Sequence, residues 1–86
     1  MVDDPIRFLI VDDKPENLMA LEALLRRDGL EVHKAGSAAE ALELMWVHDY
    51  ALALLDVHMP ETDGYELAEL MRGAERTRRL PIIFVT

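Results

Sequence analysis

Four short runs predicted to be strands alternate along the chain with segments whose apolar residues recur at helical spacing. Three of them, at 6–11, 51–55 and 81–85, are nearly continuous apolar sequence, whereas the second, at 30–34, alternates Leu30 and Val32 with the polar Glu31 and His33. Short and nearly continuous apolar runs are typical of strands buried on both faces, as in parallel sheets. Because strands alternate with helical segments, we expect right-handed crossovers and an α/β domain in which helices cover both faces of a parallel sheet.

The segment after the first run has the start and stop signals of a helix. Pro15 suits a first helical turn, where its missing N–H costs nothing. Gly29 is expected to end this helix, because glycine is common just beyond a helical C-terminus. Between them, four leucines recur at helical spacing and are expected to face the core: Leu18, Leu21, Leu24 and Leu25.

Two further helices are predicted after the second and third runs. Ser37 and Glu40 form a capping-box pattern at the start of the first of these helices. Four residues of that helix are expected to face the core: Ala38, Ala41, Leu42 and Met45. Trp46 is expected to be partly buried on the same helix. The next helix is predicted over 64–72, with three residues directed inward: Leu67, Ala68 and Met71.

Composition places the chain among single globular domains. Of its 86 residues, 51% are hydrophobic and 30% are charged, and the formal net charge is -8. This hydrophobicity excludes a disordered chain, and no apolar run approaches the roughly 20 residues of a membrane-spanning helix. The acidic charge argues against nucleic-acid binding, which depends on clustered Lys and Arg. An acidic opening, where a signal peptide is basic, and the lack of cysteine predict a cytoplasmic domain without disulfides.

Carboxylates follow two of the four runs directly. Asp12 and Asp13 come after the first run, Asp56 follows the third, and Thr86 comes after the fourth. Functional groups of such folds gather at the carboxyl ends of the strands, so these side chains are expected to share one pocket. Neighbouring carboxylates repel one another unless a cation lies among them, and hard oxygen ligands favour Mg²⁺. The pattern therefore predicts magnesium-dependent chemistry on phosphoryl groups.

Each of these residues also has an ordinary structural interpretation. Asp13 could cap the first helix, Asp56 could be a turn residue, and Thr86 could simply end a strand. Their common position after buried apolar strands favours a shared site, since caps alone do not require it. A phosphate-binding loop is disfavoured, because the segment after the first run has neither a Gly-rich fingerprint nor a Walker lysine.

Three motifs, in this order, resemble the receiver domain of two-component response regulators. They are FLIVDD at 8–13, LLDVHMP at 54–60 with Asp63 and Gly64 beyond it, and PIIFVT at 81–86. Together the motifs cover essentially the whole chain. The resemblance implies a flavodoxin-like, doubly wound parallel sheet with strand order 2-1-3-4, and a signalling module rather than an enzyme.

The resemblance also implies a role for each site residue. Asp56 would accept a phosphoryl group from a sensor histidine kinase or a phosphotransfer domain. Asp12 and Asp13 would hold Mg²⁺ together with Asp56 and the backbone carbonyl of His58. Thr86 would supply a hydroxyl that hydrogen-bonds the phosphoryl group. These roles agree with the demands of phosphoryl transfer, which needs an in-line nucleophile and neutralised charge on the equatorial oxygens.

The family has elements that this sequence does not supply. In receivers a fifth strand, which ends in a lysine, and two further helices follow the fourth strand. The only lysines here are Lys14 and Lys34, so the resemblance implies an incomplete receiver domain over 1–86, truncated after the fourth strand. That strand would form an apolar sheet edge, and apolar edges invite pairing with another chain. We therefore expect self-association.

Two other functions stay open. A phosphatase with an aspartate nucleophile, like the haloacid-dehalogenase group, would carry a second aspartate two residues beyond the nucleophile. His58 stands there instead, which makes the phosphatase the weaker alternative. The other is a dimerising scaffold that is never phosphorylated, because the family lysine is missing from the sequence.

Overall fold

Seven elements follow one another in the predicted order. The computed structural model describes residues 5–85 and contains β1 (Ile6–Val11), α1 (Pro15–Leu25), β2 (Leu30–Ala35), α2 (Ala38–Val47), β3 (Leu52–Asp56), α3 (Gly64–Arg72) and β4 (Ile82–Val85). The bounds of each strand lie within one residue of those predicted from the four runs. None of the helices in residues 5–85 has the length and apolar character that crossing a membrane requires.

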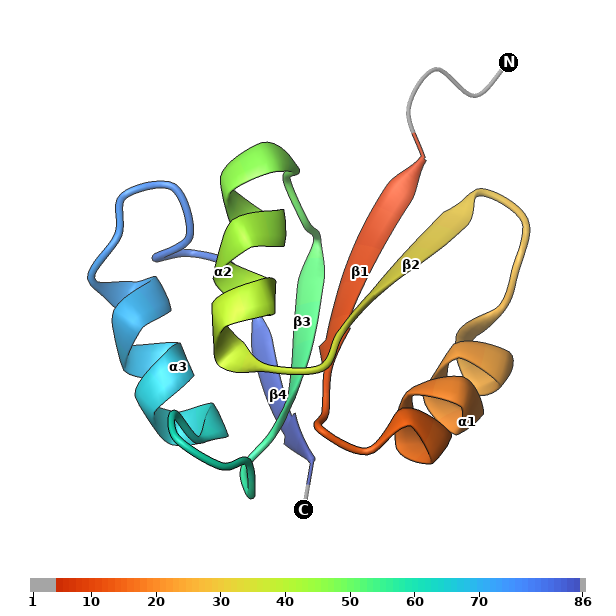
Figure 1. Cartoon of the computed structure of the whole chain (residues 1–86). Helices are drawn as coiled ribbons and strands as arrows, with labels where there is room; N and C mark the ends of the chain where they lie inside the picture. The colour runs from red at the N-terminus through yellow and green to blue at the C-terminus, as the bar shows by residue number, and fades with distance from the viewer. Residues whose placement is uncertain (1–4, 86) are drawn as a thin grey trace.

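The four strands form one parallel sheet in the order β2-β1-β3-β4, which confirms the expected topology. Val11 pairs with Ala35 of β2 and with Leu55 of β3, and Leu55 pairs in turn with Phe84 of β4. Figure 1 shows the consequence: β1 and β3 end side by side at the lower edge of the sheet, where α1 begins. Within residues 5–85, β2 and β4 are the two edge strands.

One face of the sheet carries the main core. Alternate residues of the strands, Leu9 and Val11 among them, pack with residues of α2 and α3 and are almost fully buried. The helical members of this cluster are Ala38, Ala41, Met45, Leu67, Ala68 and Met71. The amphipathic patterns of α2 and α3 therefore predicted most of their inward-facing residues correctly.

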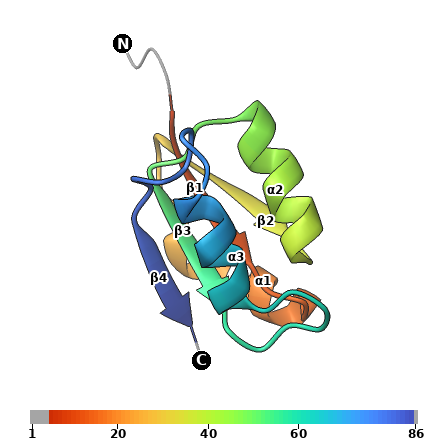
Figure 2. The ribbon, with the colours of Figure 1, turned by 90° about the vertical axis from the view of Figure 1, so that its left-hand side faces the viewer.

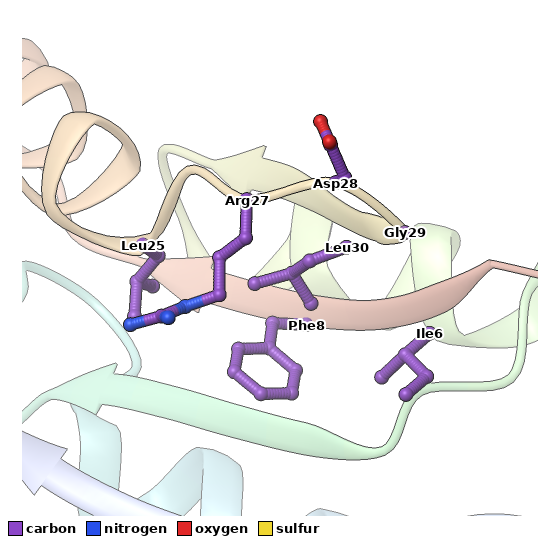
Figure 3. Close-up of a pocket in the computed structure, with 7 residues that line it drawn as sticks. All are labelled: Ile6, Phe8, Leu25, Arg27, Asp28, Gly29 and Leu30. Carbon is purple, nitrogen blue, oxygen red and sulfur yellow. The ribbon is translucent and has the colours of Figure 1, made fainter.

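The opposite face is only partly covered. Helix α1 contacts β1 and β2, with Leu18 buried, while Ile6 and Ile83 remain more than half exposed. An apolar hollow of about 480 Å³ lies beside α1 (Figure 3). Its apolar lining comes from Ile6, Phe8, Leu25 and Leu30. In this close-up the side chain of Arg27 extends toward Leu25, whereas Asp28 points away from the hollow.

Four expectations about helix ends and faces were wrong. Leu24 is 76% exposed, because only the neighbouring leucines of α1 turn toward the sheet. Gly29 does not end α1, which stops at Leu25 with Arg26 as its C-cap; Gly29 instead has a φ of +82° in the turn before β2. On α2, Trp46 is 79% exposed and Leu42 is also at the surface.

Side-chain caps fix the starts of α2 and α3. The Ser37 hydroxyl accepts a hydrogen bond from the Glu40 N–H at 3.1 Å, as the capping pattern predicts. The Glu40 carboxylate reaches back to the Gly36 N–H rather than to the cap residue. At α3 the capping box is complete, since Asp63 accepts from the Glu66 N–H and Glu66 accepts from the Asp63 N–H.

Candidate metal centre

Three carboxylates meet at the carboxyl edge of the sheet. Asp12 and Asp13 directly follow β1, and Asp56 is the last residue of β3. Because β1 and β3 pair in parallel up to Val11 and Leu55, their ends are level. One oxygen from each carboxylate lies within 4.8 Å of one oxygen from each of the others. The expected convergence of these three residues is confirmed.

Hydrogen bonds to both oxygens orient the carboxylate of Asp12. Its side chain is buried, and its Oδ1 accepts a hydrogen bond from the Lys14 N–H at 2.9 Å. Its Oδ2 accepts from the side-chain amide of Asn17 at 3.1 Å. The backbone N–H of Asp12 also donates to the Ala35 carbonyl, which extends the β1–β2 ladder by one residue. Asn17 was not singled out from the sequence; its position in the first turn of α1, just beyond the acidic pair, is the signal that points to it.

The Asp13 carboxylate differs from that of Asp12 in its hydrogen bonding. Its Oδ1 atom is buried and has no hydrogen-bond partner among residues 5–85, while the Lys14 ammonium lies 3.7 Å away. The alternative that Asp13 caps α1 is wrong, because Lys14 occupies the N-cap position. A buried carboxylate oxygen without a donor is costly unless a cation compensates it. This oxygen therefore fits the requirement of a metal ligand.

Asp56 is the member of the cluster that comes from β3, and it is 8% exposed. Its Oδ1 accepts a hydrogen bond from the His58 N–H at 3.2 Å, which orients the carboxylate, and the His58 side chain points into solvent. The Val57 N–H donates to the Val85 carbonyl, so β4 supports the backbone directly beyond Asp56. Thr86 lies outside the described residues, and its role stays a prediction.

Gly64 sets the distance between α3 and this strand end. A Cβ atom at Gly64 would collide with the Asp56 carbonyl oxygen and would lie 2.9 Å from the Asp56 carbonyl carbon and 3.0 Å from the Val57 Cα. The motif therefore needs glycine for close approach and not for a positive φ. Sequence alone left these two reasons open. Asp63 caps the helix at the same point, so the loop after Asp56 is fixed at both ends.

The donor set suits a small, hard cation. Three carboxylates supply only oxygen ligands, and the cluster includes neither a cysteine nor a histidine side chain. Such sets favour Mg²⁺, which takes one or a few carboxylates and keeps several waters. Asp12, Asp13 and Asp56 are the residues that would hold it.

Comparison with known proteins agrees with this geometry. The family described as the response regulator receiver domain matches residues 8–86. Response regulator Rre1 of Synechocystis sp. is 36% identical over 84 residues, and the match covers 96% of this chain and 36% of that protein. Transcriptional regulatory protein SrrA of Staphylococcus aureus is 40% identical over 78 residues, with 91% of this chain and 31% of that protein covered.

Solved structures give the same result. The N-terminal domain of a response regulator receiver protein from Methanoculleus marisnigri JR1 superimposes with a TM-score of 0.88 at 32% identity, over 93% of this chain and 65% of that one. A response regulator receiver protein from Pseudomonas putida gives a TM-score of 0.85 at 33% identity, over 98% of this chain and 69% of that one. The chain spans about a third of the length of the curated relatives it matches.

The sheet, the acidic cluster and these matches together define a signalling module rather than an enzyme. The chain belongs to the response regulator receiver domain family. A receiver domain implies a histidine kinase as partner, and the cluster of Asp12, Asp13 and Asp56 is consistent with the phosphorylation site of such a domain.

Proposed function

We propose that Asp56 accepts a phosphoryl group from a sensor histidine kinase or a phosphotransfer domain, with Mg²⁺ held beside it. The observation that carries the proposal is the carboxylate cluster, in which one oxygen each of Asp12, Asp13 and Asp56 lies within 4.8 Å of the others. Asp56 is the central candidate because its carboxylate ends β3 and is oriented by the His58 N–H.

The transfer is a single displacement at phosphorus. A carboxylate oxygen of Asp56 attacks the phosphorus of the partner's phosphohistidine, and a P–O bond forms as the P–N bond breaks. The electron pair of the P–N bond stays on the imidazole nitrogen, so the products are an aspartyl phosphate and an unphosphorylated histidine. Bound Mg²⁺ would neutralise charge on the equatorial oxygens.

The remaining residues of the site bind the cation, orient its ligands or contact the phosphoryl group. Asp13 offers to the cation its Oδ1, which has no hydrogen-bond donor among residues 5–85, and Asp12 contributes a second carboxylate that Asn17 and the Lys14 N–H hold in place. The backbone carbonyl of His58 is proposed as a further ligand. Thr86 is proposed to donate its hydroxyl to the phosphoryl group of Asp56. We place this function in the cytoplasm, where the partner kinases of receivers expose their phosphohistidines.

Acetyl phosphate tests this function without a kinase. The 86-residue chain is incubated with acetyl phosphate and Mg²⁺, and its intact mass is measured. We expect one phosphoryl adduct that depends on Mg²⁺ and that disappears in the isosteric variant Asp56→Asn. Asp28→Asn is the matched control, since it removes an exposed carboxylate next to Gly29, on a different loop from the cluster. This variant should retain the adduct.

Other outcomes have clear meanings. Absence of an adduct with both acetyl phosphate and a phosphorylated histidine kinase would contradict the proposal and would favour a scaffold that is not phosphorylated. Steady release of phosphate from many esters would favour a phosphatase. An adduct that persists in Asp56→Asn would place the phosphoryl group on another residue.

We further propose that the 86-residue chain self-associates through β4. This strand has a partner on one side only among the described residues, and Ile83 and Phe84 are 51% and 41% exposed. Figure 2 shows β4 at the edge of the sheet, and none of the helices drawn there lies beyond this strand. The hollow beside α1 adds a second apolar surface (Figure 3). Sedimentation velocity checks this proposal, and a monodisperse monomer at all concentrations would contradict it.

A further inference from the structure

Helix α2 is apolar on both of its faces. Its inner face is buried in the core through Ala38, Ala41 and Met45. Its outer face carries a second apolar stripe at helical spacing, formed by Ala39, Leu42, Trp46 and Val47. Trp46 and Val47 are 79% and 68% exposed. A helix that is hydrophobic all round is normally buried, so the outer stripe is unusual for a surface.

The neighbouring helices do not share this feature. Helix α3 is strongly amphipathic, because Leu67 and Met71 face the core while Glu66, Glu69 and Arg72 face outward. On α1, the exposed Met19 and Leu24 lie five residues apart and point in different directions. The exposed apolar side chains of α2 line a hollow of about 450 Å³, bordered by Leu42, Glu43, Trp46 and Val47. The hollow that Tyr65 of α3 and Phe84 line has mostly charged neighbours, namely Asp63, Glu66, Glu69 and Arg72.

The charges around the stripe are acidic. Glu40 and Glu43 lie on α2, and the helix contains no lysine or arginine. The nearest arginine contact is already used, because Arg76 pairs with Asp49 at 3.2 Å and donates to the Met45 carbonyl at 3.0 Å. A second copy of the chain would bring the same glutamates against each other across a two-fold axis. The acidic side chains beside the apolar stripe therefore disfavour pairing of α2 with a second copy of the chain and favour a basic partner.

We propose that the outer face of α2 is a docking surface for a basic amphipathic helix of a partner protein. The partner would place apolar side chains against Leu42 and Trp46 and a lysine or arginine beside Glu43, which borders the hollow, whereas the Glu40 carboxylate accepts from the Gly36 N–H. Tryptophan is enriched among the residues that dominate interface energies, and Trp46 is the single tryptophan of the chain. The binding mode is that of an amphipathic helix held by its apolar face.

This surface is separate from the carboxylate cluster. The C-terminal end of α2, which carries Trp46 and Val47, lies at the opposite end of the sheet from the carboxyl ends of β1 and β3 (Figure 1). A partner on α2 would therefore leave Asp56 accessible to a kinase. The proposal does not depend on phosphorylation, and the two functions fail or succeed independently.

Trp46 fluorescence tests the docking surface directly. The probe is a short helical peptide made of leucine and lysine, with leucines at helical spacing along one face. We expect a saturable blue shift of the emission in the micromolar range, weakened by salt because the flanking contacts are ionic. A matched peptide with every lysine replaced by glutamate is expected to give no shift. Equal binding of the glutamate peptide would overturn the proposal.

Three variants locate the binding site. Leu42→Ser and Glu43→Lys change exposed side chains of the stripe, and each is expected to weaken binding of the lysine peptide about tenfold, equivalent to about 1.4 kcal/mol. Leu24→Ser removes an even more exposed leucine from α1, 76% exposed against 38% for Leu42, and should leave binding unchanged. Circular dichroism and urea unfolding confirm that each variant is folded.

Two results would contradict the proposal. One is loss of binding in Leu24→Ser equal to that in Leu42→Ser, which would mean that the peptide recognises any exposed leucine. The other is a blue shift of Trp46 on concentrating the protein without peptide, which would identify a second copy of the chain as the occupant. Association through β4 leaves Trp46 exposed and does not produce this shift.

Discussion

At the scale of single residues, Gly64 controls the distance between α3 and Asp56. The variant Gly64→Ala places a Cβ against the Asp56 carbonyl, so the helix or the strand end must move. Overpacking of this kind costs about 2 kcal/mol, and we expect slower phosphorylation as well. Gly73→Ala is the matched control, because a Cβ there meets atoms at 3.6 Å and the backbone is right-handed helical. Urea unfolding measures the free energy of unfolding of both variants. Equal values would show that α3 can shift to accommodate the added Cβ without loss of stability.

Asn17 acts on the cluster through Asp12. Its amide donates to Asp12 Oδ2 at 3.1 Å, so Asn17→Ala leaves that buried oxygen without its donor. Loss of a hydrogen bond that orients a metal ligand typically weakens metal binding by about 10-fold to 100-fold. We expect a decrease of about tenfold in Mg²⁺ affinity, measured by calorimetric titration.

The control for Asn17 is another exposed residue of the same helix. Met19→Ala shortens an exposed side chain on α1 that lies two residues further along and should leave Mg²⁺ affinity unchanged. An unchanged affinity in Asn17→Ala would show that the Lys14 N–H alone suffices to hold Asp12.

At the scale of elements, continuous apolar sequence predicted β1, β3 and β4, because such runs have few alternatives in a parallel sheet, and alternation of apolar and polar residues predicted β2. Helical spacing was less decisive on α1 and α2. Most positions of these helices are apolar, so periodicity alone does not show that Leu25 turns inward while Leu24 and Trp46 turn outward. On α3 the polar positions remove this ambiguity, and its inward residues were predicted correctly.

The same distinction applies to the site. Asp12, Asp13 and Asp56 could be predicted to converge because each follows a strand, and parallel strands end at one edge. Asn17 and Gly64 could not be assigned their roles, since the hydrogen bond to Asp12 and the contact with Asp56 depend on how α1 and α3 dock.

A polar link joins β2 to the segment after α2. Tyr50 and His33 Nδ1 are 2.6 Å apart, and His33 Nε2 lies 2.8 Å from the Glu31 carboxylate. The hydrogen bond from His33, and next that from Arg7, lowers the pKa of Glu31. Burial raises the pKa of Tyr50, so folding favours its neutral form.

The raised pKa of Tyr50 predicts a loss of stability in alkali. Its contribution is fully present below the ordinary tyrosine pKa of about 10 and is lost as pH rises through the higher pKa of the folded state. Tyr50→Phe removes the ionisable hydroxyl and the hydrogen bond to His33, which costs about 1 kcal/mol at neutral pH. Urea unfolding at neutral pH and about one unit above the ordinary tyrosine pKa should therefore show a smaller alkaline loss in the variant. An equal loss in both proteins would assign the alkaline transition to other groups.

At the scale of the whole molecule, the two edges of the sheet differ in character. The edge strand β2 carries Glu31, His33 and Lys34, which discourage pairing with another chain, whereas all four residues of β4 are apolar. The net charge of -8 opposes association at long range, and salt screens this repulsion. Association through β4 should therefore strengthen as salt concentration rises.

The variant Ile83→Lys places a charge on this exposed edge. Ile83 is 51% exposed, so the fold tolerates lysine there, while a lysine side chain on an edge strand prevents its pairing with a second strand. We expect Ile83→Lys to sediment as a monomer at concentrations where the unmodified chain associates. Leu24→Lys adds the same charge to an exposed leucine of α1 and should not abolish association. If both variants dissociate the protein equally, net charge rather than the β4 edge determines assembly.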